Sequence, residues 1–526
     1  MTKHSARRNL SYAFLALSIL LLASLACART VKDDETPLWS VTNLKSSPKT
    51  GSVQAAQAAQ GMPPAVNSES DSPAATPSGP VLTPTPDQPR VLPTLRADPI
   101  EYFIESGDTL GNIARQFGIT WEYLGEYNDI DDPNQLDIGQ QISIPPPTPD
   151  GNSPDFKIIP DSELIYGPTT ANFNVEEFIL SKGGYLANYE EEVNEVPLSG
   201  VQIVTRIAQD FSVNPRLLLS VLEHQSGWVT NSDIEKNQRD YPIGLENEQR
   251  KGLYLQLAYA ANNLNRGFYL WRVNGIGAWS LVDGTILIAS PTVNAGTAGV
   301  QHLFSTLLGR NAWESAVSPD GLHATYSALF GNPFGYEGEP VDTANLIQPP
   351  MNLPFAESEE WSYTGGPHSA WGDGSAWAAL DFAPPGEDVG CIKSDAYVLS
   401  AADGLITRAG DGAVIQDLDG DGLEQTGWVI LYMHIAERDR VEPGTYLSAN
   451  QPIGHPSCEG GISSGTHVHI ARRYNGEWIP ADQEVPFVLD RWITVGTGSE
   501  YDGYLKRGRK QVEAYAGRSP DNIVTR

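Results

Sequence analysis

The spacing of hydrophobic and polar positions changes along the chain, and these changes predict its division into segments. Residues 28–98 are rich in Ser, Pro, Ala, Thr and Gln and show neither helical nor strand periodicity, so we expect a flexible tether. Residues 155–350 follow a mainly helical period. Residues 355–526 contain short β-branched runs between Gly and Asp clusters, which are typical of antiparallel strands joined by turns.

The stretch from Tyr102 to Pro145 alternates first and then follows a period near 3.6 residues. It predicts a strand over 102–105, helices over 108–117 and 120–128, and a closing strand over 140–144. This β-α-α-β order, with its fixed Gly-Asp-Thr-Leu and Gly-Gln offsets, resembles the LysM module, which binds N-acetylglucosamine-containing glycans. The resemblance implies a LysM domain over residues 99–147, with glycan contacts from Gly107, Asp108, Thr109, Asn128 and Ile130.

The helical region contains one stretch with a candidate catalytic position. In "VNPRLLLSVLEHQSGW", Asn214-Pro215 predicts a cap and first turn. The stretch resembles the helix of lysozyme-like lytic transglycosylases that carries the catalytic glutamate before Ser-Gly. Here Gln225 has that place and cannot protonate a glycosidic oxygen, while Glu223 lies about 200° around the helix. The resemblance implies an inactive transglycosylase-like domain; a glycosidase that uses Glu223 and an unrelated helical domain are the alternatives.

Length and charge restrict the class of protein. A chain of 526 residues is too long for one core and predicts several domains. The net charge of -31 argues against a nucleic-acid partner, because a phosphate backbone would be repelled, and it predicts an acidic, well-solvated surface.

The first 27 residues have the features of an export signal. Basic residues precede an apolar run from Tyr12 to Leu22, which is too short for a membrane span. The ending at Ala26-Cys27 resembles a bacterial lipoprotein signal, which implies that Cys27 is lipidated and anchors the protein to the membrane. Ser24 stands where that family usually has Leu, so simple secretion is the alternative. Export also predicts a disulfide between Cys391 and Cys458.

Five of the nine histidines fall between residues 368 and 469. In "GTHVHI", His467 and His469 are separated by one residue, so in a strand both would face the same side. One of them could bind a metal ion while the other contacts a water molecule.

Four motifs, "GGPH", "AALDFAPP", "LYMHI" and "GTHVHI", resemble those of the lysostaphin-type zinc metallopeptidases, which cut peptidoglycan peptides. The resemblance implies a zinc site, with ligands His368, Asp381 and His469 and catalytic residues His434 and His467. Twelve residues separate His368 from Asp381 where the family usually has three, so the inserted loop must return His368 to the metal. Asp373 is a nearer carboxylate, but "LDFAP" fits the ligand-bearing strand better. His455 is expected to hold a turn.

The segment "QDLDGDGLEQTG" raises the question of a calcium site. Asp417, Asp419 and Asp421, followed by Gly422, match the first half of an EF-hand loop. The twelfth position is Trp428 instead of Glu, so the bidentate ligand is missing. A polar turn is therefore expected, with calcium as the alternative.

Together these patterns predict a multidomain α+β protein of the cell envelope. A LysM module would bind peptidoglycan glycan strands, and a C-terminal zinc endopeptidase would hydrolyse its peptide stems or cross-bridges. An inactive peptidoglycan-binding or regulatory lipoprotein that controls other wall hydrolases is the alternative function. A glycan-cleaving enzyme that acts through the helical region is a weaker third one.

Overall fold

The computed structural model describes residues 86–526 except 106, 118, 131, 134, 337, 339, 340 and 387–389. The predicted signal with Cys27 and most of the predicted tether lie outside these residues. The described chain forms two compact units, residues 99–145 and residues 146–526 together with 86–98. Within the described part, no helix is long and apolar enough to cross a membrane.

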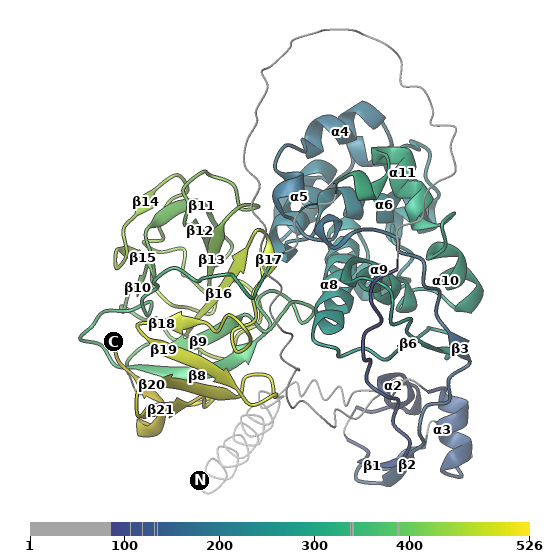
Figure 1. The fold of residues 1–526 in the computed structure, drawn as a ribbon, viewed down its shortest axis with the longest axis horizontal. Helices are drawn as coiled ribbons and strands as arrows, with labels where there is room; N and C mark the ends of the chain where they lie inside the picture. Colours follow the sequence, from purple (N-terminus) through teal and green to yellow (C-terminus); the bar gives the residue numbers. More distant parts are fainter. Residues whose placement is uncertain are drawn as a thin grey trace, which may run out of the picture. The chain divides into compact units, whose positions relative to one another are not determined.

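The smaller unit has the predicted β-α-α-β order. Its two strands pair antiparallel, with Ile100 opposite Ile144, and the side chain of Thr120 caps the second helix by accepting from the Tyr123 N–H. Both helices contribute to a small apolar core that contains Leu110, Phe117 and Leu124. The elements are β1 (Ile100–Phe103), α2 (Leu110–Gln116), α3 (Trp121–Tyr127) and β2 (Gln141–Ile144) (Figure 1).

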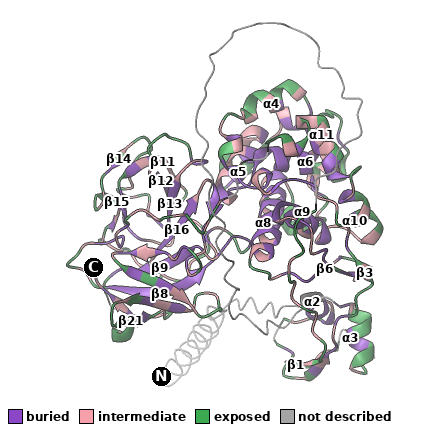
Figure 2. Ribbon diagram, viewed as in Figure 1, coloured by how far each residue is buried: buried purple, intermediate pink, exposed green. Residues whose placement is uncertain are grey.

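The helical part of the larger unit, residues 155–350, surrounds α8, which packs against α5 and α9. Helices α6, α8 and α9 are mostly buried, whereas α4 is more exposed (Figure 2). The helices are α4 (Val175–Lys182), α5 (Gly200–Phe211), α6 (Pro215–Ser226), α7 (Lys236–Asp240), α8 (Leu253–Arg272), α9 (Ala295–Ser305), α10 (Arg310–Ala316) and α11 (Leu322–Phe330). Short strands accompany them: β3 (Gly151–Asn152), β4 (Glu190–Val193), β5 (Val196–Ser199), β6 (Ala278–Ser280) and β7 (Ile286–Ile288).

Helix α6 begins where its sequence predicts. The side chain of Asn214 accepts from the Arg216 N–H, and Pro215 occupies the first turn, where its missing N–H is not needed. The helix ends at Gly227, whose φ of 68° is a left-handed conformation that glycine adopts without strain. These local signals fix the helix that contains Glu223 and Gln225.

The β part, residues 355–526, is built on a nine-stranded sheet whose pairings are all antiparallel. The strand order is β14-β11-β12-β13-β16-β9-β8-β22, and β17 pairs with β16. Its strands are β8 (Trp361–His368), β9 (Ala379–Ala383), β11 (Gly404–Gly410), β12 (Ala413–Asp417), β13 (Trp428–Met433), β14 (Tyr446–Leu447), β16 (Val468–Tyr474), β17 (Glu477–Trp478) and β22 (Ile523–Val524). The antiparallel sheet confirms the predicted mixed α and β class.

Two smaller sheets complete the β part. The strands β10 (Val398–Leu399) and β15 (Pro452–Gly454) pair with each other. A four-stranded meander lies in the C-terminal extension and packs against β8: β18 (Val488–Leu489), β19 (Trp492–Gly496), β20 (Gly503–Arg507) and β21 (Lys510–Glu513).

The helical and β parts contact each other through buried polar groups. Arg408 of β11 forms ion pairs with Asp210 of α5, at 2.7 Å, and with Glu424, at 2.6 Å. The Ser212 hydroxyl donates to the Gly476 carbonyl at 2.6 Å. Both carboxylates are almost fully buried, so separating the two parts would leave buried charges without partners.

Residues 86–98, the last part of the expected tether, lie along the helical part. The Asp87 and Arg90 N–H groups donate to the carbonyls of Thr292 and Pro291, each at 3.0 Å. The Arg90 guanidinium also donates to the Asn274 side chain at 2.9 Å. This end of the segment is therefore an ordered strap, which the Pro-rich composition did not indicate.

Candidate metal centre

Three neighbouring strands bring the predicted metal ligands together. In the sheet register, His469 of β16 lies opposite Asp381 of β9. His368 is the last residue of β8, after two register shifts that interrupt the pairing of this strand with β9. Such bulges re-aim side chains, and here they turn His368 toward the other two residues. The loop that separates His368 from Asp381 therefore does not keep them apart.

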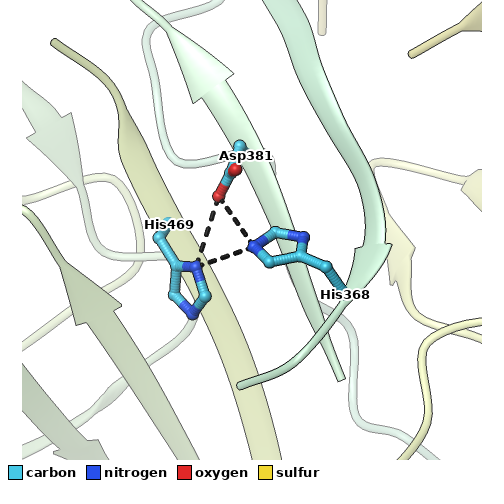
Figure 3. A group of neighbouring side chains, drawn as sticks. All are labelled: His368, Asp381 and His469. Carbon is cyan, nitrogen blue, oxygen red and sulfur yellow. Dashed lines mark hydrogen bonds and ion pairs between the residues drawn. The ribbon is translucent and has the colours of Figure 1, made fainter. Parts of the chain in front are cut away.

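The three side chains converge on one point (Figure 3). His368 Nε2 lies 2.9 Å from His469 Nδ1 and 3.2 Å from Asp381 Oδ1. His469 Nδ1 lies 3.3 Å from the same carboxylate oxygen. All three residues are buried, so little water reaches these atoms.

Backbone carbonyls determine which ring nitrogens carry hydrogen. His368 Nδ1 lies 2.7 Å from the Gly366 carbonyl, and His469 Nε2 lies 3.0 Å from the Ala370 carbonyl. A carbonyl can only accept, so each of these nitrogens is the N–H donor. In the neutral rings, His368 Nε2 and His469 Nδ1 then hold lone pairs that face each other and the carboxylate. Three acceptors at this distance require a cation between them, either a proton or a metal ion.

The local electrostatics agree with a cation site. Burial alone would raise the pKa of Asp381, but the neighbouring His368 and His467 outweigh it and hold the pKa well below the ordinary value. Burial would lower the pKa of His368, but the Asp381 charge outweighs it and raises that pKa. Burial lowers the pKa of His469. Asp381 Oδ1 has no hydrogen-bond partner within the described residues, although three ring nitrogens lie near it.

The donor set fits zinc better than the alkaline-earth ions. Two imidazoles and one carboxylate form a three-ligand set found in catalytic zinc sites, which keep a fourth position open. Tetrahedral bonds of about 2.0–2.1 Å place ligand atoms roughly 3.3 Å apart, close to the separations seen here. Calcium and magnesium prefer oxygen ligands.

The other two predicted catalytic histidines border this group. His467 Nδ1 lies 2.7 Å from the Gly465 carbonyl, and its Nε2 lies 3.7 Å from Asp381 Oδ1. His434 Nδ1 lies 3.0 Å from the Glu459 carbonyl, and its ring centroid lies 4.4 Å from that of His467. Burial, and then the nearby His467 and His469, lower the pKa of His434 to about 3. Both rings therefore present Nε2 as a proton acceptor.

Two residues of the C-terminal extension contact the site, and the sequence reasoning missed them. The Tyr501 ring stacks on His368 with centroids 4.3 Å apart. Glu500 accepts from the Ser369 N–H at 3.1 Å, although 131 residues separate the two. No motif connects this turn with the histidines, so only the fold reveals the contact.

The neighbouring candidates lie outside the group. Asp373 is exposed and forms an ion pair with Arg266 at 3.3 Å, so its carboxylate is not among the three converging groups. His455 has its Nδ1 2.8 Å from the Ala396 carbonyl, and its role in a turn stays a prediction. The predicted disulfide between Cys391 and Cys458 is present.

The three aspartates of the possible calcium loop also lie together. They are used in a turn: Asp417 accepts from the Gly422 N–H at 2.9 Å, and Asp421 accepts from the Thr426 hydroxyl at 2.8 Å. Trp428, at the twelfth position, is buried at the start of β13. The turn satisfies the expectation of a polar hairpin, and calcium stays a prediction.

The predicted glycan-binding residues of the small unit mostly use their side chains within it. Asp108 accepts from the Tyr102 hydroxyl and the Glu105 N–H, and the Thr109 hydroxyl accepts from the Asn112 N–H. Asn128 both donates to and accepts from the Ser143 backbone, and Ile130 packs against the core. Gly107 has a φ of 101°, which the turn after β1 requires. Glycan contact by these residues stays a prediction.

In the helical part, Glu223 lines a cavity of about 400 Å³ with Lys182, His224, Thr230, Thr325, Ala328 and Leu329. Its carboxylate accepts from the Val229 and Thr230 N–H groups, each at 3.0 Å, and from the Thr230 hydroxyl. Gln225 Nε2 is buried without a hydrogen-bond partner among the described residues. The carboxylate of Glu223, the acidic residue on this stretch of α6, is therefore occupied by hydrogen bonds to the turn that follows the helix.

Two family models match parts of this chain. Residues 102–145 match the family described as LysM domain, and residues 157–342 match the family described as LasA, N-terminal domain. The first match confirms the predicted LysM module. The second covers the helical part, for which the lysozyme-like resemblance stays a prediction.

Protease LasA and two solved peptidase structures are similar to parts of this chain. Protease LasA of Pseudomonas aeruginosa (strain UCBPP-PA14) is 26% identical over 371 residues, which cover 66% of this chain and 80% of LasA. Pseudoalterin, described as an M23 metalloprotease from the deep sea, is 25% identical, with a TM-score of 0.28, over 35% of this chain and 99% of its own. The lysostaphin catalytic domain of Staphylococcus simulans is 22% identical, with a TM-score of 0.18, over 24% and 94%.

Proposed function

We propose that this protein is a cell-wall-binding zinc metalloendopeptidase that hydrolyses peptide stems or cross-bridges of peptidoglycan. The observation that carries the proposal is the group of three facing acceptors on His368, Asp381 and His469, which requires a cation. The LysM match and the similarity to protease LasA support a wall substrate and a peptidase activity.

The three ligands are His368 Nε2, His469 Nδ1 and Asp381 Oδ1. Bound zinc supplies Lewis acidity, which polarises a peptide carbonyl and lowers the pKa of a water molecule toward about 7. The carbonyls of Gly366 and Ala370 hold the two ring N–H groups and so keep both metal-facing nitrogens unprotonated.

The remaining histidines move protons. His467 donates its Nδ1 hydrogen to the Gly465 carbonyl, so its Nε2, directed toward the ligand side, accepts the proton of the attacking water. His434 carries its hydrogen on Nδ1 as well. Its low pKa means that a proton taken up at Nε2 is readily given away, which suits donation to the leaving amine or to the oxyanion.

An inactive regulatory lipoprotein is less well supported. The insertion between His368 and Asp381 would favour it only if it kept His368 from the site, and His368 Nε2 lies 3.2 Å from Asp381 Oδ1. Export and anchoring through lipidated Cys27 are part of the proposal and rest on the sequence of residues 1–27 alone. Fatty-acid labelling that persists in Cys27→Ser would refute the anchor.

The proposal is tested by incubating purified peptidoglycan with the protein and identifying the products by mass spectrometry. New peptide ends should appear, and a zinc chelator should suppress them. Intact peptides in both samples would refute the peptidase assignment.

Deletion of residues 99–147 should weaken binding to the wall and leave the rate of peptide hydrolysis unchanged. The small unit has its own core, so its removal leaves the metal centre intact. We expect less protein to sediment with peptidoglycan and an unchanged rate on a soluble peptide, because the module acts by raising the local concentration. Equal sedimentation of the deleted and full-length chains would contradict this role.

Glu223→Gln should leave glycan strands untouched and lower stability. The amide cannot accept three hydrogen bonds as the carboxylate does. The free energy of unfolding, measured by denaturant titration, should therefore fall by about 1–2 kcal/mol. Anhydro-muropeptides that the unmodified protein produces and this variant does not would show that the helical part is an active glycosidase.

A further inference from the structure

Residues 369–378 connect β8 to β9, and we call them the metal-site loop. The loop closes on itself, since the Ala370 N–H donates to the Ala376 carbonyl at 3.2 Å and the Trp371 N–H donates to the Ser375 hydroxyl at 2.9 Å. This is the insertion that lengthens the spacing between the first two predicted ligands.

The tip of the metal-site loop contacts helix α8 of the helical part. The side-chain oxygen of Asn262 accepts from the Gly374 N–H at 3.0 Å, and its amide donates to the Asp373 carboxylate. Arg266, one turn further along α8, forms an ion pair with Asp373 at 3.3 Å. One amide and one guanidinium therefore hold two consecutive residues of the loop.

The approach of loop and helix is close enough to require glycine. A Cβ atom at Gly374 would lie 2.0 Å from the Asn262 carbonyl oxygen. At Gly372, which has a φ of 63°, a Cβ atom would lie 2.5 Å from the Asn262 side-chain oxygen. The loop backbone thus rests directly on α8, with no space for side chains between them.

The base of the same loop contacts the metal centre. The carbonyl of Ala370 accepts the Nε2 hydrogen of His469 at 3.0 Å. Since His469 offers Nδ1 to the metal only while Nε2 holds the hydrogen, the position of this carbonyl determines whether the ring is ready to bind. A short segment, from Ala370 to Gly374, therefore links the metal ligand to helix α8.

We propose that Asn262 and Arg266 are positioning residues for the metal centre: through Asp373 and Gly374 they hold the metal-site loop so that Ala370 orients His469. The inference rests on the proposed zinc site. It makes the helical part a contributor to metal affinity, although none of its residues is among the three predicted ligands.

Asn262→Asp tests the proposal, because it replaces the amide donor with a carboxylate that repels Asp373. Zinc affinity, measured by competition with a chromogenic chelator, should fall about 10-fold, the low end of the range for losing a partner of a metal ligand. The visible spectrum of the Co(II)-substituted protein should change as well, because the orientation of His469 changes.

Two further variants separate positioning from general damage. In the double variant Asn262→Asp/Asp373→Asn, the carboxylate at position 262 can accept from both the Gly374 N–H and the new amide. Arg266 loses its ion pair but can still donate to the side-chain oxygen at position 373, so most of the affinity and the original spectrum should return. Asp411→Asn is the matched control: Asp411 is also an exposed carboxylate, and it pairs with Arg206 of α5 at 2.7 Å, far along the chain from the loop. This variant should bind zinc like the unmodified protein.

The outcomes distinguish this inference from the proposed function. An unmodified chain that takes up no zinc would refute the metal site itself. If the unmodified chain binds zinc, the inference is overturned by unchanged affinity in Asn262→Asp, by failure of the double variant to recover, or by an equal loss in Asp411→Asn. Thermal melting of each variant confirms that the comparison is made on folded protein.

Discussion

His469→Ala is expected to remove zinc from the purified protein. The substitution deletes one of the three proposed ligand atoms, and His368 and Asp381 then offer two where a catalytic zinc site needs three. The loss of affinity should exceed the roughly 10–100-fold that follows loss of a group hydrogen-bonded to a metal ligand. Elemental analysis after dialysis measures it as metal bound per chain.

His455→Ala is the control for this experiment. His455 is a buried histidine of the same β part, and its Nδ1 lies 2.8 Å from a backbone carbonyl, outside the group of three. This variant should keep its zinc. If His469→Ala binds as much zinc as His455→Ala, the ligand set proposed here is wrong.

His467→Ala should keep its zinc and lose about 10²–10⁴-fold in rate, the usual contribution of a general base. Its Nε2 lies 3.7 Å from Asp381 Oδ1, beyond the separations within the ligand group, so the proposal assigns it to the water and not to the metal. Turnover of a soluble peptide, measured on samples of known zinc content, separates the effect on rate from any effect on metal binding.

A different pair of results would change the assignment. Loss of zinc in His467→Ala would make His467 a ligand. If the variants of His467 and His469 both keep metal and activity, the two residues form only a polar strand face, and the peptidase proposal fails.

The parts of the structure that the sequence predicts are those determined by neighbouring residues. The LysM module follows from short, fixed offsets, and the start of α6 follows from Asn214-Pro215, because caps and periodicity act within a few residues. The shared orientation of His467 and His469 follows from the two-residue period of a strand, and both rings reach the same carboxylate oxygen.

The parts of the structure that the sequence does not predict depend on residues that are far apart in the chain. The Tyr501 ring reaches His368 through the fold of a C-terminal meander, and Asn262 reaches Asp373 across 111 residues. Neither contact has a periodic signal. The strap at residues 86–98 was missed for a similar reason: its hydrogen bonds are made by backbone groups, which composition does not reveal.

In the helical part, the sequence pattern did not predict the hydrogen bonds of the Glu223 carboxylate. The sequence around Glu223 matches a catalytic helix in its spacing, but the carboxylate is bound by the turn that follows. Whether a carboxyl group is available for chemistry depends on its hydrogen bonds, and these appear only once the turn at Val229 and Thr230 is placed.

The space around Gly365 restricts which substitutions the metal centre can tolerate at this position. A Cβ atom at this position would lie 2.6 Å from Asp381 Oδ2, so β8 can pass the carboxylate only without a side chain. Every amino acid that a single-base change in a glycine codon can introduce carries a Cβ atom. No single-base change that replaces this glycine therefore preserves the site without a shift of the Asp381 side chain, and selection for the activity of this centre should act against each such replacement.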